Sequence, residues 1–263
     1  MKKFLKTVAA LLAIPVALSA VAVYLRYMWG FAVSSFASYW SFWLGWAVCP
    51  LLVLSISRSS MVGAIASRVY VIEHELTHAL FALVSGARVK KISVKKDNGA
   101  VVVDKANTII TLAPYFFPLF ASGVFLAWIL AAHFIVNKPS PRFDYWIFQA
   151  GYFLVAFALS FHFFMTARAV MDGQSDIKRD GAVYSFTVIF IVYVSVSALL
   201  MKFMFKGASG FNALGDFFSD ILKMASAIYS SLWKFFRVEI YPELKNIFTA
   251  GRQAGGGGEV KVL

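Results

Sequence analysis

Long apolar runs, separated by short polar or basic stretches, make up most of this 263-residue chain. Each run is close to the ~20 residues that an α-helix needs to cross the hydrocarbon core of a bilayer. The pattern therefore predicts an all-α polytopic membrane protein with about six transmembrane helices. The six predicted spans cover residues 4–24, 30–55, 61–86, 108–136, 148–172 and 182–205.

Two segments depart from this pattern. Residues 87–103 alternate apolar and basic positions and contain Asp97-Asn98-Gly99. Because Asn-Gly between two β-rich runs favours a tight turn, this segment predicts a small β-hairpin directly after the third span. In residues 207–250, apolar side chains recur at three- and four-residue steps among charged ones, which predicts a C-terminal amphipathic helix.

These changes in pattern divide the chain into four predicted parts. The last part is glycine-rich and is predicted to be a flexible tether. Its β-prone end could pair with the edge of the hairpin and slow the protein's activity, or it could have no role. The parts are N-terminal transmembrane segments (1–58), a membrane core with the candidate site (59–206), the amphipathic helix (207–250) and the flexible tail (251–263).

Composition supports a membrane protein and narrows its partners. Hydrophobic residues make up 60% of the chain and charged residues 14%, whereas a soluble domain has about 45–50% and 25%. The net charge of +12 is typical of loops that meet anionic lipid headgroups, and we do not expect a nucleic-acid partner. The single cysteine, Cys49, excludes a disulfide framework or a cysteine metal site within the chain. The oligomeric state is not indicated.

Residues 4–24 allow two interpretations. Lys2, Lys3 and Lys6 precede an apolar run of about 18 residues, which is longer than the ~7–15 residues of a signal-peptide core and favours a retained helix. A cleaved signal is the alternative. The orientation is also open, because six spans with these lysines inside put the hairpin outside, whereas the hairpin's own lysines favour the inside.

A metal-binding pattern lies within the third apolar run, at His74-Glu75-Leu76-Thr77-His78. Positions i and i+4 share one face of a helix, so both imidazoles can reach one metal ion. Zinc bound there would lower the pKa of a bound water to about 7, and Glu75 could take its proton. An ionised group at membrane depth costs about 2.5–3.5 kcal/mol, so a purely structural helix has no reason to carry these residues. We expect one Zn²⁺ per chain.

A catalytic zinc ion usually has three protein ligands and one open position for water. The candidates for the third ligand are His162 and the acids Asp172, Asp176 and Asp180, which are spaced by four. His162 and Asp176 would lie about 21 Å apart along an unbroken helix, so both cannot bind one ion. The residues alone leave the choice open.

Three stretches resemble the site-2 protease family of intramembrane zinc metalloproteases, in a bacterial branch without a PDZ domain. They are EHELTHALFALVSGARVKKISV (73–94), NTIITLAPYFFPLF (107–120) and FHFFMTARAVMDGQSDIKRDGAVYSFTVIF (161–190). The resemblance covers residues 60–195. It implies a protein of a prokaryotic cytoplasmic (inner) membrane that acts in regulated intramembrane proteolysis on a transmembrane protein substrate.

The resemblance also implies an aspartate as third ligand, at the end of the fifth span. Gln-Ser-Asp makes Asp176 the first choice and Asp172, followed by glycine, the alternative. The family's usual Asn-Pro and Leu-Asp-Gly pattern is absent here. His162 is then a candidate for substrate binding or for stabilising the oxyanion.

The predicted function is that of a zinc metalloendopeptidase, which hydrolyses peptide bonds of membrane-embedded substrates with zinc-activated water and Glu75 as the catalytic base. The hairpin could pair with an unwound substrate as an added strand, or it could be a structural anchor. The main alternative is a non-proteolytic zinc-binding scaffold or chaperone, which the presence of Glu75 disfavours. A transporter is disfavoured because the sequence shows neither repeats nor paired broken helices.

Overall fold

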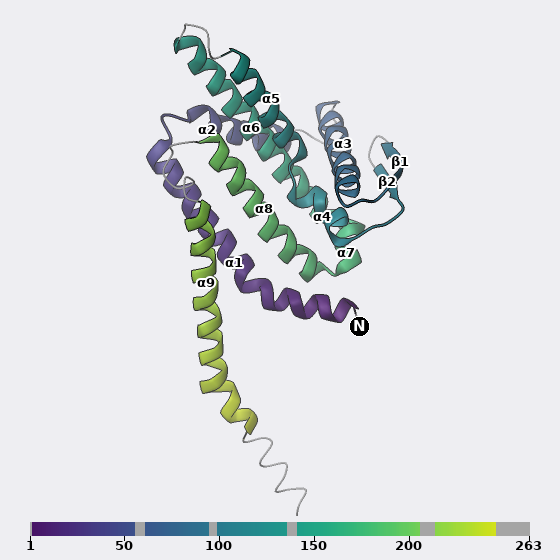
Figure 1. Ribbon diagram of the computed structural model, residues 1–263, viewed down its shortest axis with the longest axis vertical. Helices are drawn as coiled ribbons and strands as arrows, with labels where there is room; N and C mark the ends of the chain where they lie inside the picture. The colour runs from purple at the N-terminus through teal and green to yellow at the C-terminus, as the bar shows by residue number, and fades with distance from the viewer. Residues whose placement is uncertain (1, 56–60, 95–98, 136–140, 206–213, 246–263) are drawn as a thin grey trace, which may run out of the picture.

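The computed structural model describes residues 2–55, 61–94, 99–135, 141–205 and 214–245. In this part of the chain, helices form a bundle and one two-stranded antiparallel sheet lies at one end of it, beside α3 (Figure 1). The helices are α1 (Lys2–Ser35), α2 (Trp40–Ser55), α3 (Met61–Val84), α4 (Thr108–Phe116), α5 (Leu119–Ile135), α6 (Pro141–Met171), α7 (Ser175–Asp180), α8 (Ala182–Met204) and α9 (Leu214–Phe235). A π-helical turn, η1 (Phe236–Ile240), follows α9, and the strands are β1 (Val89–Val94) and β2 (Gly99–Val103).

Among the described helices, α1, α6 and α8 are each long and apolar enough to cross a membrane. Helices α4 and α5 pass the same test as a pair that is bent by 65°, which gives up to four candidate spans. The predicted six spans are therefore not confirmed. The predicted second span is shortened because residues 30–35 belong to the first helix, which leaves 16 residues in α2. The predicted third span corresponds to α3, which carries several ionisable groups.

The bend between α4 and α5 follows from Pro118. A proline disfavours the helical conformation of the residue before it, and Phe117 is accordingly extended, with φ −111° and ψ 106°. The first N–H groups of the restarted helix have no partner within that helix. One of them, on Phe120, donates to Glu73 Oε1 of α3 at 3.1 Å. The break thus joins α5 to the helix that carries the histidines.

An aromatic cluster packs α1, α2, α6, α8 and α9 together. Phe31 is fully buried, and its ring centroid lies 4.5 Å from that of Phe205 and 6.0 Å from that of Phe42. Helix α9 occupies part of the predicted C-terminal helical region, and its buried residues recur every four positions, the first two of them within this cluster. They are Phe217, Ile221 and Ala225.

The predicted hairpin forms as β1 and β2, with Ile92 opposite Val101. Its turn, residues 95–98, lies outside the described residues. The same holds for the glycine-rich tail 251–263 and for the pairing that we predict for its end.

Gly45 of α2 provides a test of the packing between α2 and α6. A Cβ atom there would lie 3.1 Å from Ala156 Cβ and would press against the Phe153 carbonyl oxygen, which is backbone and cannot move aside. We expect Gly45→Ala to lower the free energy of unfolding by about 1–3 kcal/mol. Gly30→Ala is the matched control, because nothing lies within 4 Å of its Cβ position. Equal thermal midpoints in detergent would contradict the packing described here.

Candidate metal centre

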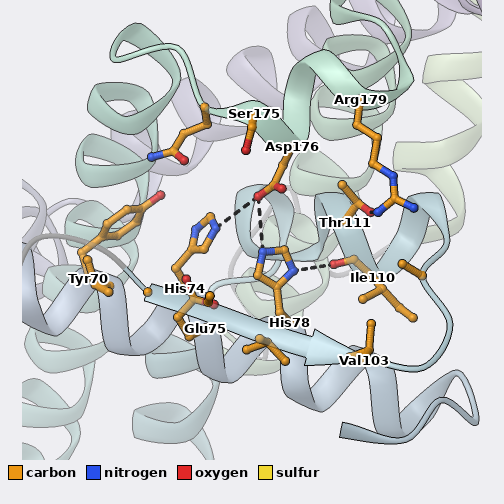
Figure 2. A pocket seen from close by; sticks show the side chains of 16 residues that line it. Tyr70, His74, Glu75, His78, Val103, Ile110, Thr111, Ser175, Asp176 and Arg179 are labelled. Carbon is orange, nitrogen blue, oxygen red and sulfur yellow. Dashed lines mark hydrogen bonds and ion pairs between the residues drawn. The ribbon is translucent and has the colours of Figure 1, made fainter. Parts of the chain in front are cut away.

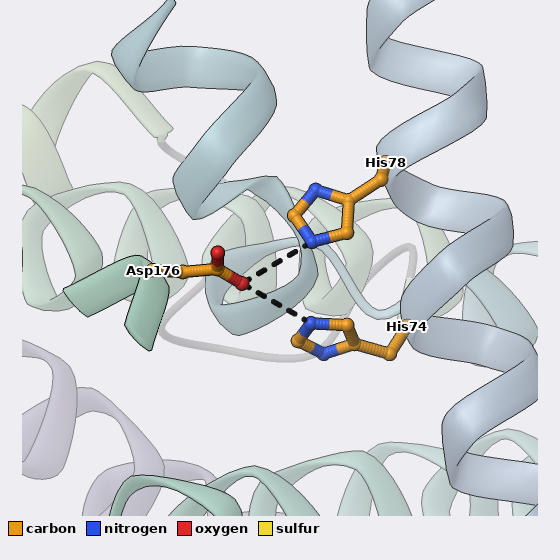
Figure 3. Close-up of side chains that lie close together, drawn as sticks. All are labelled: His74, His78 and Asp176. Atoms are coloured by element: carbon orange, nitrogen blue, oxygen red, sulfur yellow. Dashed lines mark ion pairs between the residues drawn. The ribbon is translucent and has the colours of Figure 1, made fainter. Parts of the chain in front are cut away.

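Helices α3 and α7 bring two imidazoles and one carboxylate together (Figure 3). His74 and His78 project from one face of α3, and Asp176 faces them from α7. The Asp176 Oδ2 atom lies 3.6 Å from His74 Nε2 and 3.4 Å from His78 Nε2. All three candidate ligand atoms lie within 4.8 Å of one another.

This spacing suits a tetrahedral zinc ion better than direct hydrogen bonds. Ligand atoms about 2.0–2.1 Å from zinc lie about 3.3 Å apart along an edge of the tetrahedron. The two nitrogen–oxygen distances of 3.4 and 3.6 Å are close to that edge. They exceed the ~2.7–2.9 Å of a charge-assisted hydrogen bond. The three residues therefore fit a zinc ion in both chemistry and geometry.

A backbone contact orients the second histidine. His78 Nδ1 lies 2.7 Å from the carbonyl oxygen of Ile110, at which a protonated Nδ1 donates a hydrogen bond. This arrangement leaves the Nε2 lone pair free to face Asp176 and a metal ion. Ile110 itself is held by Asn107, whose side chain caps α4 by accepting from the Ile110 N–H at 2.8 Å.

The Asp176 carboxyl is in the ionised form that a metal ligand requires. Burial by itself raises the pKa of this carboxyl, but without a metal ion an imidazole N–H of His74 or His78 that points at Asp176 outweighs burial and lowers that pKa. A metal cation bound between the three residues would take the place of that proton. The Tyr115 hydroxyl also donates to Asp176 Oδ2, at 3.4 Å. The Tyr115 ring lies edge-on to His74, with centroids 5.2 Å apart.

The chain reaches Asp176 through a break in the helix rather than along a continuous one. Helix α6 ends at Met171, Gly173 adopts φ +81°, and α7 begins at Ser175. Asp172 is exposed in this turn, and among the described residues the metal-binding group contains Asp176 and not Asp172. A continuous helix would have aligned Asp172, Asp176 and Asp180 on one face. The break separates Asp172, in the turn, from the two acids of α7.

Glu75 lines a pocket of 360 Å³ together with the three candidate ligands. Figure 2 shows β2 passing in front of the two histidines, with Asp176 above them. Gly99 of β2 lies directly against Glu75, and a Cβ atom at Gly99 would be 2.6 Å from Glu75 Oε1. Only glycine at this position leaves the carboxylate where it is.

The structure places His162 away from this pocket. His162 is fully buried, its Nδ1 lies 3.3 Å from Glu73 Oε1, and its ring stacks on Tyr193. It is not among the residues that line the pocket, so the structure does not bring it together with the candidate ligands, and its part in substrate binding or oxyanion stabilisation stays a prediction. Its partner Glu73 had no assigned role in the sequence, although an acid in an apolar helix calls for a buried partner.

Several other residues at the site carried little sequence signal. Tyr115 stood out only as part of a proline-flanked stretch, Gln174 and Ser175 were noted only as neighbours of Asp176, and Arg179 lines the pocket without belonging to a motif. Arg179 Nη1 of α7 donates to Thr111 Oγ1 of α4 at 3.1 Å. These contacts depend on how α4 and α7 meet, which periodicity does not predict.

Comparison with known proteins supports the part of the site that lies on α3. Neither the curated proteins nor the solved structures provide a match. Residues 64–170 match the family model of Peptidase M50B-like proteins. This stretch contains His74, Glu75 and His78 but ends before Asp176. The chain is thus similar to Peptidase M50B-like proteins over α3, the sheet, α4, α5 and almost all of α6.

Proposed function

We propose that the protein is an intramembrane zinc metalloendopeptidase, of the site-2 protease type without a PDZ domain, that cleaves membrane-embedded proteins. The observation that carries this proposal is the group formed by His74, His78 and Asp176, with Glu75 beside it in one pocket. The similarity to Peptidase M50B-like proteins supports a peptidase. The candidate spans support an integral membrane protein.

His74, His78 and Asp176 would hold the zinc ion. When bound, zinc supplies Lewis-acid chemistry and lowers the pKa of water to about 7. Glu75 would accept the proton of the attacking water and pass it to the leaving amine. Its place against Gly99 limits where its carboxylate can lie. Tyr115 and the Ile110 carbonyl would fix the orientation of two of the ligands.

A substrate helix must unwind before it can be cut, because its carbonyl groups are engaged in backbone hydrogen bonds. In the described sheet, β2 pairs with β1 alone, so its other edge has no strand partner. Residues of β2 line the pocket. We propose that an extended substrate segment adds to this edge as a strand and presents its carbonyl to Glu75.

The basic segments support a cytoplasmic position for the site. Lys6 near the start of α1 contacts Thr108 at the start of α4 and Asp180 at the end of α7. The start of α1, the two-stranded sheet and α7 lie toward the same side of the bundle (Figure 1), and these segments contain Lys3, Lys6, Lys90, Lys91, Lys178 and Arg179. The positive-inside rule assigns that side to the cytoplasm.

Replacing Glu75 tests the proposed activity. We expect Glu75→Gln to keep its zinc and to lose at least the ~10²–10⁴-fold that a general base contributes. The measurement compares membrane proteomes of cells that express the wild-type protein with those that express Glu75→Gln, by sequencing new protein N-termini. Cuts within apolar spans should appear only with the wild type. Zinc binding without any such cut in either sample would favour a scaffold or chaperone.

Zinc content tests the ligand set. Purified wild-type protein should hold about one zinc per chain. Each of His74→Ala, His78→Ala and Asp176→Ala should lose more affinity than the roughly 10–100-fold that removal of a supporting residue costs. Asp172→Ala is the matched control and should bind zinc as the wild type does. Retention of zinc by Asp176→Ala together with loss in Asp172→Ala would reverse the assignment.

Gly99 tests the position of the base independently of the metal. A methyl group at this position must displace Glu75 or β2, so Gly99→Ala should slow cleavage by about 10- to 100-fold while zinc stays bound. Gly123→Ala on α5 is the control, because nothing lies within 4 Å of its Cβ position. Wild-type cleavage by Gly99→Ala would show that the carboxylate position is not critical.

A further inference from the structure

A three-way polar contact lies next to α7, outside the pocket. Lys6 Nζ of α1 is 2.6 Å from Asp180 Oδ1, at the end of α7. Thr108 Oγ1, at the start of α4, donates to Asp180 Oδ2 at 2.6 Å and accepts from Lys6 Nζ at 3.0 Å. Lys6 Nζ also lies 5.2 Å from the centre of the Tyr184 ring. Four helices thus meet at one ammonium group.

The contact matters because α7 is short and is held by a small number of specific contacts, which also include the Arg179–Thr111 hydrogen bond and a hydrogen bond from Ser185 Oγ to the Ile177 carbonyl. The helix has six residues, and isolated helices shorter than ~12–15 residues are marginal in water. A glycine with positive φ precedes it, Gly173 at +81°, and another follows it, Gly181 at +96°. Its N-cap residue, Gln174, makes no capping hydrogen bond, and Ile177 is its only buried residue. The place of α7 therefore depends on a few specific contacts.

Asp176 and Asp180 are one helical turn apart on α7. A shift at the Asp180 end of so short a helix therefore moves the Asp176 carboxylate relative to α3. We propose that Lys6, together with Thr108, is a positioning residue that fixes α7 through Asp180 and so sets the third ligand against His74 and His78. The inference rests on the proposed function only in that Asp176 is a metal ligand.

The charge state and burial of the contact support a positioning role. The side chains of Lys6 and Asp180 are 30% and 13% exposed. Burial raises the pKa of the Asp180 carboxyl, but the hydrogen bonds from Lys6 and Thr108 outweigh it and lower that pKa. Because the carboxylate uses both of its oxygen atoms, the contact constrains the direction of α7 as well as its distance from α1.

This inference makes the N-terminal segment part of the metal centre's support. Cleavage of residues 4–24 as a signal would remove Lys6 from Asp180 and Thr108 and leave a buried carboxylate with one partner fewer. The mature protein should accordingly retain this segment, which N-terminal sequencing of the purified chain can check.

The test compares Lys6→Met with Lys6→Arg and with Lys3→Met, an exposed lysine on the same helix. The first readout is the rate at which zinc passes from the full-length protein in detergent to a chelator. The loss of one partly buried ion pair corresponds to about a fivefold faster release in Lys6→Met. Lys3→Met should release zinc at the wild-type rate. Lys6→Arg keeps the positive charge, so its rate should be close to that of the wild type.

The second readout is amide hydrogen exchange, measured on the metal-free protein. Exchange in residues 174–181 should accelerate in Lys6→Met while exchange in α3 stays unchanged. Thr108→Val is the second variant, in case Lys6→Met does not fold, and it should show the same pattern more weakly. Because Lys6 and Asp180 act together, Asp180→Asn should add little to Lys6→Met.

The outcomes separate this inference from the proposed function. If the wild type binds zinc through Asp176 and zinc release changes less than twofold in Lys6→Met and in Thr108→Val, the positioning role is wrong. Faster exchange throughout the bundle, rather than in α7, would also overturn it, because that result indicates a general loss of stability. If Asp176→Ala retains its zinc, the ligand assignment itself fails.

Discussion

The polar contacts that Glu73, His74 and His78 of α3 make with neighbouring helices organise the centre of this protein. Charged or polar groups buried in an apolar bundle are costly unless each has a partner. Glu73 has His162 and the Phe120 N–H, and His78 has the Ile110 carbonyl and Asp176. These contacts draw α4, α5, α6 and α7 toward one helix. The bend at Pro118 has a role in this arrangement, because it leaves the Phe120 N–H without a partner in its own helix and thus free to donate a hydrogen bond to Glu73.

The part of the candidate site that lies on one helix was predictable from the sequence. His74, Glu75 and His78 follow from the spacing of residues on a single face, so no knowledge of tertiary packing was needed. The third position was harder, because Asp176 reaches the histidines only after the helix breaks at Gly173. A resemblance to known proteins ranked it first, whereas helical periodicity left the neighbouring acids equivalent.

Other features were not predictable because they depend on contacts between distant segments. His162 appeared available to a substrate, yet its partner Glu73 lies 89 positions earlier and buries it. The six predicted spans were not confirmed, because hydropathy does not show where one long helix ends and the next begins. The role that we propose for Lys6 depends on Asp180, which lies 174 positions later in the chain. The two-stranded sheet, by contrast, is local, and its alternation and turn signal were sufficient to predict it.

Zinc X-ray absorption spectroscopy on two cysteine variants tests the central claim, that Asp176 completes a metal centre with His74 and His78. Cys49 is buried in α2, so the wild-type spectrum should contain only nitrogen and oxygen neighbours, at about 2.0–2.2 Å. Asp176→Cys should add one sulfur neighbour at about 2.3 Å, and Asp172→Cys should add none. Bound zinc without a sulfur neighbour in Asp176→Cys, or with one in Asp172→Cys, would contradict the account.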